Sequence, residues 1–444
     1  MSGYDVAVVG SGPGGATVAR ELARAGARVI VLERGDDGPP TGRARQALRE
    51  LWLPGRSMSV TSWRTREPVA VLRGVTLGGS SMYFFGTAWE PPYAWLDAFG
   101  VDLRADTEAL RAELAPAPLP PELTGPRARI LAEAALALGH DWRPVPKFVD
   151  QAKLAASGPA GYGAARWNAR RFLDDAVAAG AVVRGGSNVA RVLVASGRVE
   201  GVEMVSAGIH HVVRARTVVL AAGGLGTPGL LQSAGVTGAG RDWFYDPVMA
   251  VNGVLPGLDA GFEPPMCGAA FYPDAGYTLT DLCRPRWLHE TLAAVSGQVG
   301  RVGDFRSTLS VMVKIRDELS GTVSARGIAH KPLAPVDRRR LGEGEQAARA
   351  LLAQAGARHV HATNRVAVHP GGTARIGDVV TSDLAAGVQG LFVCDASVLP
   401  VAWGIPPTFT ILALARRLAR HLGGAGAAAI PAGFGRVAVG ESLP

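Results

Sequence analysis

Hydrophobic and polar positions near the N-terminus follow two periods in succession, which together predict a strand, a helix and a second strand. Residues 4–9 form a short apolar run that ends in glycines, as expected for a strand buried on both faces. Residues 16–25 then place apolar side chains at helical spacing, and residues 27–33 form a second apolar run that ends in an acidic residue. The segment therefore predicts a β-α-β unit, the building block of a parallel sheet.

Further along the chain the same two periods predict a mixture of helices and strands. Helical spacing occurs at residues 102–114, 127–138, 172–179, 342–355 and 410–422, and the proline-rich residues 115–126 are expected to form a loop. Short strands are predicted at 182–183, 189–194, 201–205 and 217–222. From residue 246 to about residue 326, alternation of apolar and polar residues predominates, which is typical of an antiparallel sheet.

These elements predict an α/β fold in which a discontinuous Rossmann-like dinucleotide-binding domain is joined to an α+β domain with an antiparallel sheet. The dinucleotide-binding domain is expected to comprise residues 1–245, with an irregular excursion at 36–73, and to return at residues 365–422. The substrate-binding domain is expected at residues 246–364. The Gly/Ala-rich residues 423–444 are predicted to be a flexible tail.

Composition and charge exclude several classes of protein. The 444 residues carry a net charge of +8, but the arginines are scattered without a dense run, which argues against nucleic-acid binding. No apolar run approaches the roughly 20 residues that span a bilayer. The three cysteines are too few and too far apart for a disulfide framework or a metal site. No signal peptide precedes the first strand, so we expect a soluble, cytoplasmic protein.

The turn after the first strand, Gly10-Ser11-Gly12-Pro13-Gly14-Gly15, is a dinucleotide-binding motif. Gly10 allows a tight bend, Gly12 lets the backbone approach a pyrophosphate, and Gly15 lets the helix pack closely on the strand. The helix N-terminus would attract the phosphates, and Glu33 is placed to bind ribose hydroxyls. The residues expected to contact the cofactor here are Gly10, Gly12, Pro13, Gly14, Gly15, Glu33 and Arg34.

Two further glycine turns and a C-terminal block narrow the choice of dinucleotide. The first motif suits FAD and NAD equally, whereas a second glycine turn, Gly78-Gly79-Ser80-Ser81, would be excessive for an NAD enzyme. A third turn, Ala222-Gly223-Gly224, follows the strand at 217–222. The C-terminal block contains His369-Pro-Gly-Gly-Thr, then Asp395-Ala396, and then Pro406-Pro407-Thr408 before the last helix.

These segments, in this order, resemble the glucose–methanol–choline (GMC) oxidoreductases, a family of FAD flavoenzymes. The resemblance covers residues 4–35, 73–92, 161–236 and 366–422, and residues 237–365 carry little motif, as expected for a variable substrate domain. It implies that Gly78, Gly79, Ser80 and Ser81 line the flavin side of FAD, that Val189 lies near the adenine, and that Asp395 contacts the pyrophosphate–ribityl region. It also assigns Ala222, Gly223, Ala396, Pro407 and Thr408 to the cofactor site. From the residues alone, an N-cap or turn role for Asp395 stays open.

His369 matches the family's catalytic histidine, and its chemistry suits that role. Hydride transfer from an alcohol to flavin N5 requires removal of the hydroxyl proton, and a neutral imidazole can accept it near pH 7. We therefore predict an FAD-dependent alcohol dehydrogenase or oxidase acting on the CH–OH group of a small alcohol, polyol or sugar-like substrate. Oxygen or another carrier would accept the electrons. A purely structural histidine is the competing interpretation.

Three residues depart from the family pattern. Pro406 or Pro407 occupies the place of a second polar residue near the flavin, and Thr408 and Trp403 are the candidates to replace it. Phe84 replaces a frequent asparagine, and Tyr83 stands where some members carry a histidine linked covalently to FAD, so we expect non-covalent FAD. The missing polar residue keeps two alternatives open. One is another reaction class, such as a desaturase, amine oxidase or photodecarboxylase, and the other is a non-catalytic flavin-binding subunit.

Overall fold

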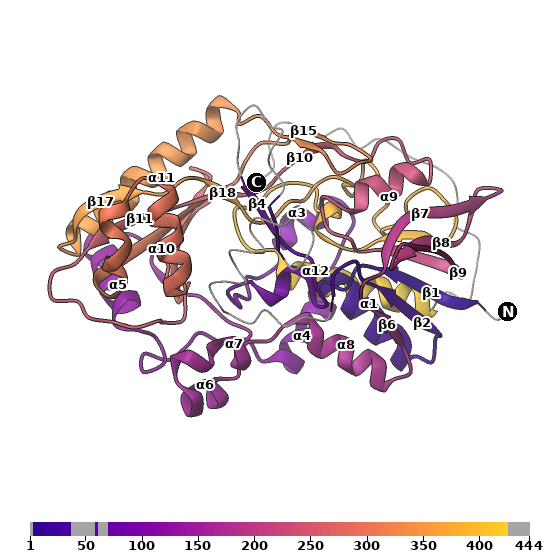
Figure 1. Ribbon diagram of the computed structural model, residues 1–444, viewed down its shortest axis with the longest axis horizontal. Coiled ribbons are helices and arrows are strands. Elements are labelled where there is room, and N and C mark those ends of the chain that lie inside the picture. Colours follow the sequence, from indigo (N-terminus) through magenta and orange to yellow (C-terminus); the bar gives the residue numbers. More distant parts are fainter. Residues whose placement is uncertain (1–2, 37–57, 61–69, 425–444) are drawn as a thin grey trace.

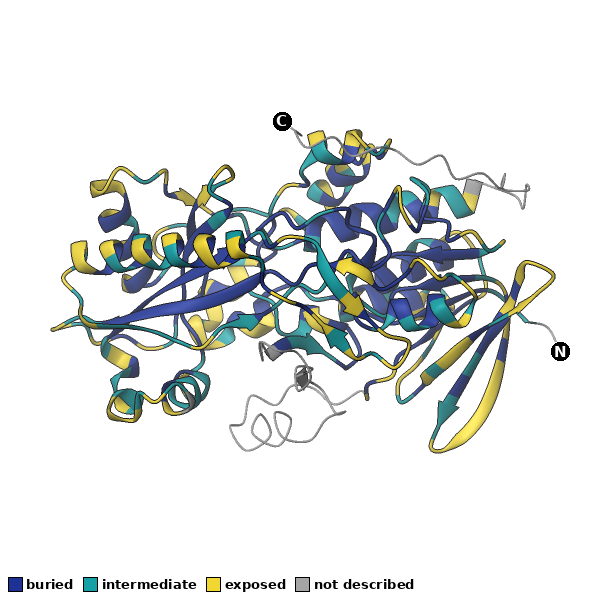
Figure 2. Ribbon diagram, turned by 90° about the horizontal axis from the view of Figure 1, so that it is seen from above, coloured by how far each residue is buried: buried dark blue, intermediate teal, exposed yellow. Residues whose placement is uncertain are grey.

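The computed structural model describes residues 3–36, 58–60 and 70–424, which form two sheets lying side by side (Figure 1). Most of the predicted excursion at 36–73, and residues 425–444 of the predicted tail, lie outside the described residues. Buried residues concentrate in the strands of both sheets (Figure 2). The predicted combination of a Rossmann-like domain and an α+β domain with an antiparallel sheet is confirmed.

The first sheet contains the predicted β-α-β unit. Its strand order is β6 (Val182–Arg184), β2 (Val29–Leu32), β1 (Tyr4–Val9), β9 (Ile209–Leu220), β8 (Arg198–Ser206) and β7 (Asn188–Ala195), and β19 (Leu391–Val393) also pairs with β9. Strands β6, β2, β1, β9 and β19 are parallel. Helices α1 (Pro13–Arg24), α8 (Ala169–Ala178), α12 (Thr408–Gly424) and α4 (Arg104–Leu114) pack together beside it.

Strand β9 differs from the prediction, because the strand expected at 217–222 is the second half of a longer one. Residues 209–214 pair antiparallel with β8, whereas residues 215–220 pair parallel with β1. The first half is mostly exposed and the second half is mostly buried, so polar and apolar positions change their pattern within one strand. That change of environment explains why only the buried half was predicted as a strand.

The second sheet is mainly antiparallel and carries helices on one face. Its order is β3 (Met58–Val60), β4 (Ala70–Gly74), β18 (Val366–Ala367), β11 (Pro247–Val254), β14 (Thr308–Ile315), β13 (Tyr277–Asp281), β12 (Gly268–Tyr272) and β5 (Arg143–Pro144), with β17 (Arg358–Ala362) also paired to β11. Leu309, Val311 and Val313 of β14 belong to the core with helices α11 (Pro335–Gln354) and α5 (Pro126–Ala137). Strands β4 and β5 thus join this sheet, although both precede residue 246.

The region in which strand-like alternation predominates also contains a helix, α10 (Arg286–Val295), which was not predicted, followed by a 3-10 segment, Val299–Ser307. The shorter elements are α3 (Tyr93–Asp97), α6 (Gln151–Ser157), α7 (Tyr162–Ala165), α9 (Thr227–Ser233) and a small sheet of β10 (Arg241–Trp243), β15 (Ser320–Val323) and β16 (Ala329–His330). Among the described helices, none combines the length and apolar character needed to cross a membrane. All three cysteines are buried and free.

Candidate functional site

A cavity of about 1760 Å³ runs from the first glycine turn, between the two sheets, to α10. One end is lined by the three glycine turns and the start of α12, and the other end by β11, β14 and α10. His369 lies on its wall together with residues from both sheets. A cavity of this volume has room for a dinucleotide and a further small molecule.

The first glycine turn is tightly packed against neighbouring backbone on one side and faces open space on the other. A Cβ atom at Gly10 would lie 2.2 Å from the Ala221 carbonyl oxygen, and one at Gly14 would lie 2.0 Å from that of Cys394. A Cβ atom at Gly12, in contrast, would meet nothing within 4 Å. Gly12 is also the N-cap of α1 and no side chain caps that helix end, so its N–H groups can bind phosphate oxygens. The turn therefore fits a pyrophosphate.

The second glycine turn abuts the first, since a Cβ at Gly79 would lie 2.9 Å from Gly12 Cα. Glu33 ties this region together: it accepts hydrogen bonds from Ser11 N (3.0 Å), Ser11 Oγ (2.7 Å) and Gly35 N (2.8 Å). Its carboxylate therefore orders the turn within the chain and also lies on the cavity wall, where a ribose hydroxyl would reach it.

The structure brings most of the sequence-predicted site residues to this cavity. Its wall includes Gly10, Gly12, Pro13, Gly14, Glu33, Arg34, Gly79, Ser80, Ser81, Val189, Ala222, Gly223, Asp395, Ala396, Pro407, Thr408 and His369. Gly15 and Gly78 do not line it. A Cβ at Gly15 would lie 2.1 Å from the Gly10 carbonyl oxygen, so this glycine serves the packing of α1 on the turn. The Gly78 N–H instead donates to Ser11 Oγ at 3.1 Å.

Asp395 lies at the end of β19, as predicted, and its carboxylate is engaged inside the protein. Oδ2 accepts from Gly223 N at 2.8 Å and from Thr227 Oγ1 at 2.5 Å, and Oδ1 accepts from Ser397 N at 2.7 Å. The Ser397 contact is an N-cap, one of the roles considered for this residue. Because the Gly223 contact fixes the third glycine turn, Asp395 shapes the cavity through backbone groups as well as through its own position on the wall.

His369 forms a compact cluster with two buried charged residues that the sequence reasoning had not found. Its Nδ1 lies 3.0 Å from Asp246 Oδ2 and 3.0 Å from Lys314 Nζ, and Lys314 Nζ lies 2.9 Å from Asp246 Oδ2. Asp246 directly precedes β11, and Lys314 lies on β14. The second sheet thus supplies both partners of the histidine.

The two partners favour opposite tautomers of His369. Asp246 only accepts, so it binds an Nδ1–H and leaves the Nε2 lone pair free, whereas Lys314 only donates and would bind an Nδ1 lone pair. Nε2 has no hydrogen-bond partner among the described residues. In the Nδ1–H tautomer, Asp246 accepts from both His369 Nδ1–H and Lys314 Nζ, and Nε2 is left as an acceptor.

Electrostatics keep this histidine neutral. Burial, followed by the positive charge of Lys314, lowers the pKa of His369 to about 4, against the raising effect of Asp246. The Lys314 charge in turn is among the causes that lower the pKa of the Asp246 carboxyl and keep it ionised, even though burial opposes this. A neutral imidazole beside an ionised carboxylate is ready to accept a proton.

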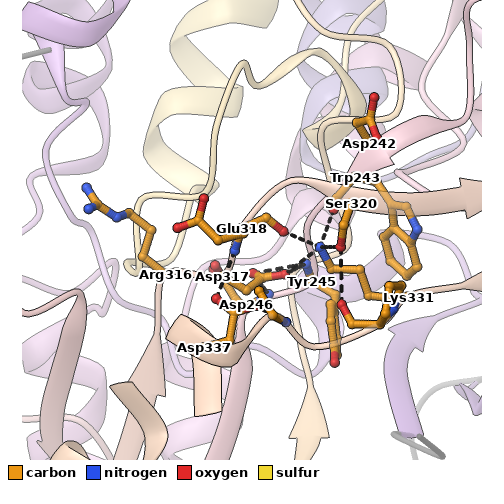
Figure 3. A network of polar contacts seen from close by, with 12 residues as sticks. Asp242, Trp243, Tyr245, Asp246, Arg316, Asp317, Glu318, Ser320, Lys331 and Asp337 are labelled. Atoms are coloured by element: carbon orange, nitrogen blue, oxygen red, sulfur yellow. Dashed lines mark hydrogen bonds and ion pairs between the residues drawn. The ribbon is translucent and has the colours of Figure 1, made fainter. Parts of the chain in front are cut away.

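A second network of polar contacts holds Asp246 in place (Figure 3). Asp317 accepts hydrogen bonds from the backbone N–H groups of Tyr245 (3.2 Å) and Asp246 (3.0 Å). Lys331 Nζ lies 3.1 Å from Asp317 and donates to the Trp243 carbonyl oxygen at 2.6 Å. Asp246 has φ +48°, a left-handed conformation that aspartate tolerates better than most residues. The network therefore fixes an unusual backbone conformation at Asp246, the residue that contacts His369.

The two predicted substitutes for a second polar residue differ in position. Thr408 lies on the cavity wall, as do Pro406 and Pro407. Trp403 does not line the cavity, and its buried indole Nε1 has no hydrogen-bond partner among the described residues. The polar group beside His369 is Lys314, and its sequence signal was the one charged residue in the strand of residues 308–315.

Comparison with known proteins agrees with this geometry. The two models of the GMC oxidoreductase family match residues 14–248 and 308–415. An uncharacterised GMC-type oxidoreductase from Mycobacterium tuberculosis is 31% identical over 94% of this chain and 75% of its own length. A long-chain-alcohol oxidase from Arabidopsis thaliana is 25% identical over 92% of this chain and 65% of its own length.

Solved structures share the fold at lower sequence identity. Pyridoxine 4-oxidase from Mesorbium loti superposes with a TM-score of 0.70 at 19% identity, covering 94% of this chain and 99% of that one. Formate oxidase from Aspergillus oryzae, in a study of FAD modification, gives a TM-score of 0.72 at 17% identity, covering 96% and 99%.

Proposed function

Since the chain belongs to the GMC oxidoreductase family, we propose that it binds FAD non-covalently and oxidises the CH–OH group of a small-molecule alcohol, with His369 as the base. The observation that carries this proposal is the cluster of His369, Asp246 and Lys314 on the wall of the large cavity. A purely structural histidine would not need a place on the wall of that cavity with an Nε2 that has no hydrogen-bond partner among the described residues.

Different residues of the cavity would bind different parts of the cofactor. The first glycine turn and the N-terminus of α1 would hold the pyrophosphate, Glu33 the ribose, and Val189 the adenine end. The second glycine turn and the start of α12 would lie at the flavin, where the positive end of a helix stabilises negative charge on the ring. Tyr83, also on the wall, does not offer the imidazole that a covalent histidine link requires.

The reaction needs one proton acceptor, and the cluster supplies it. Bound FAD provides the hydride acceptor for the carbinol carbon. His369 Nε2 takes the hydroxyl proton, and the imidazolium that results keeps its Nδ1–H on Asp246 at 3.0 Å. Lys314 balances the Asp246 charge before the reaction, so His369 is neutral and competent at pH 7.

Anaerobic addition of alcohols to the purified yellow protein tests this proposal directly. We expect bleaching of the flavin absorbance by at least one class in a panel of aliphatic alcohols, polyols and glycosides, and recovery of the colour with a suitable electron acceptor. Bleaching by amines but not by alcohols would contradict the alcohol assignment. A purified protein without any flavin would contradict the cofactor assignment.

Gly12→Val should weaken FAD binding without unfolding the protein. The new side chain meets no protein atom near its Cβ and would occupy the space assigned to the pyrophosphate. We expect at least about tenfold weaker FAD binding, or ~1.4 kcal/mol, measured by flavin content and by titration of the apoprotein. Gly342→Ala, at an open position in α11, is the control and should retain FAD. Equal flavin content in both variants would argue against a pyrophosphate at Gly12.

The acid limb of the kcat/KM profile should lie near pH 4 in the wild type. The neutral imidazole is the active form, so activity is lost only as the pH falls through the lowered pKa, below the ordinary value of about 6.5. Lys314→Met should move this limb toward higher pH, because the Lys314 charge is one cause of the low pKa. Lys153→Met, at an exposed lysine of α6, should not move it. A wild-type limb near pH 6.5 would refute this electrostatic account.

A further inference from the structure

Beyond His369 the cavity continues along one face of the second sheet. On β14, residues 310, 312 and 314 share this face, and they pair with residues 252, 250 and 248 of β11. Lys314, at one end, contacts His369. Ser310 lies four residues away, which is roughly 14 Å at the rise of an antiparallel strand.

We call this part of the cavity, between Lys314 and Ser310, the arm. The middle of the arm is apolar. Val248, Ala250, Met266, Leu282 and Met312 form one buried cluster, and all five line the cavity. Helix α10 supplies further apolar side chains to the wall at Leu288 and Leu292. Such a wall favours a hydrocarbon stem, because each buried methylene group contributes about 0.8 kcal/mol.

The far end of the arm carries a buried cation. Arg284 lines the cavity and is 7% exposed. Its Nη2 donates to Asn252 Oδ1 at 2.7 Å and lies 3.4 Å from Ser310 Oγ. Asn252 and Ser310 are themselves joined, because Ser310 Oγ donates to Asn252 Oδ1 at 2.7 Å. Two neutral side chains of the sheet thus hold the guanidinium in position.

Arg284 has no counter-ion within the described part of the chain. It forms no ion pair with any carboxylate there, and its Nε and Nη1 have no hydrogen-bond partner. Burial lowers its pKa to about 10, so the group is charged at neutral pH. Arg127 on α5, in comparison, is a buried arginine that forms an ion pair with Glu263 at 2.8 Å. An unpaired buried charge is costly, and an anionic ligand would remove that cost.

Building on the proposed oxidation at His369, we propose that the substrate is an amphiphilic alcohol with a terminal carboxylate, which Arg284 binds at the far end of the apolar arm. The reacting hydroxyl lies at His369, the hydrocarbon stem lies along Ala250 and Met312, and the carboxylate takes no part in the reaction. A planar guanidinium suits a carboxylate because two parallel N–H groups can bind its two oxygens. ω-Hydroxy acids of medium chain length have this shape.

Two matched substrates, two variants of Arg284 and one control variant test the proposal. Wild-type enzyme should prefer ω-hydroxydecanoate over 1-decanol by about 100-fold in kcat/KM, as expected for charge-assisted hydrogen bonds. Arg284→Met should remove this preference and retain turnover of 1-decanol. Arg365→Met, at the half-buried arginine that also lines the cavity, should keep the preference. Arg284→Gln is the second variant, in case the methionine variant does not fold.

A binding measurement separates this inference from the oxidation itself. Decanoate, which has no hydroxyl group to oxidise, should raise the melting temperature of the wild type and of Arg365→Met but not that of the Arg284 variants. Stabilisation that depends on Arg284, without oxidation of any alcohol, would support the carboxylate site and overturn the proposed reaction. Oxidation of 1-decanol as efficient as that of ω-hydroxydecanoate, or a preference that survives at Arg284→Met and Arg284→Gln, would overturn the carboxylate site alone.

Discussion

His369→Ala is expected to lower kcat for alcohol oxidation by about 10²–10⁴-fold, the usual contribution of a positioned base. Alanine removes the Nε2 acceptor, while Asp246 and Lys314 remain paired at 2.9 Å. The cofactor end of the cavity is untouched, so flavin content and the absorbance spectrum should stay those of the wild type. Single-turnover bleaching under anaerobic conditions measures the loss at the chemical step.

His211→Ala is the matched control for this loss. His211 is exposed on β9 and does not line the cavity, so its replacement should leave the bleaching rate unchanged. Raising the pH should restore part of the activity of His369→Ala, because an alkoxide no longer needs a base. A His369→Ala enzyme that bleaches at the wild-type rate would show that another group accepts the proton.

Asp246→Asn is expected to destabilise the protein by about 3–5 kcal/mol, the usual cost of removing one partner of a buried ion pair. Asparagine leaves the Lys314 ammonium buried without its counter-charge, and both side chains are only 2% exposed in the wild type. The double variant Asp246→Asn/Lys314→Met should recover most of this loss, since it removes both charges. Denaturant unfolding of the holoenzyme at constant FAD concentration measures each free energy.

Asp259→Asn provides the control for this cycle. Asp259 forms an ion pair with Arg306 in which both side chains are exposed, and such pairs contribute little to stability. Its replacement should leave the unfolding midpoint unchanged within error. If the double variant were as unstable as Asp246→Asn alone, the unpaired Lys314 charge would not be the cause of the loss. The left-handed backbone at position 246 would not be the cause either, because asparagine tolerates it as well as aspartate does.

The gathering of the glycine turns at one end of the cavity was predictable because their signals are local. The turn at residues 10–15 joins consecutive elements, so spacing along the chain reports spacing in the fold. The same holds for the His369 block, which is recognisable from its own residues. The strand expected at 217–222 was right in its buried part but too short, because β9 begins at residue 209 and passes from an exposed hairpin into the buried parallel sheet without a break.

The chemical environment of His369 was not predictable in the same way. Asp246 and Lys314 lie 123 and 55 positions away in the sequence, and only the register of β11 against β14 brings them to the histidine. Helix α10 was missed because its residues 286–295 lie between segments of strand-like alternation. Arg284 shows no local pattern at all, and its lack of a counter-ion among the described residues is visible only in three dimensions.

Strand β14 has a practical consequence for anyone who redesigns this protein. On one face of this strand, Lys314 contacts His369, Met312 lines the apolar part of the cavity, and Ser310 contacts Arg284. A one-residue insertion or deletion would turn this face toward the helices and present Val311 and Val313 to the cavity. Engineering of the preference for the chain length of the proposed substrate should therefore preserve the length of the strand and vary Met312.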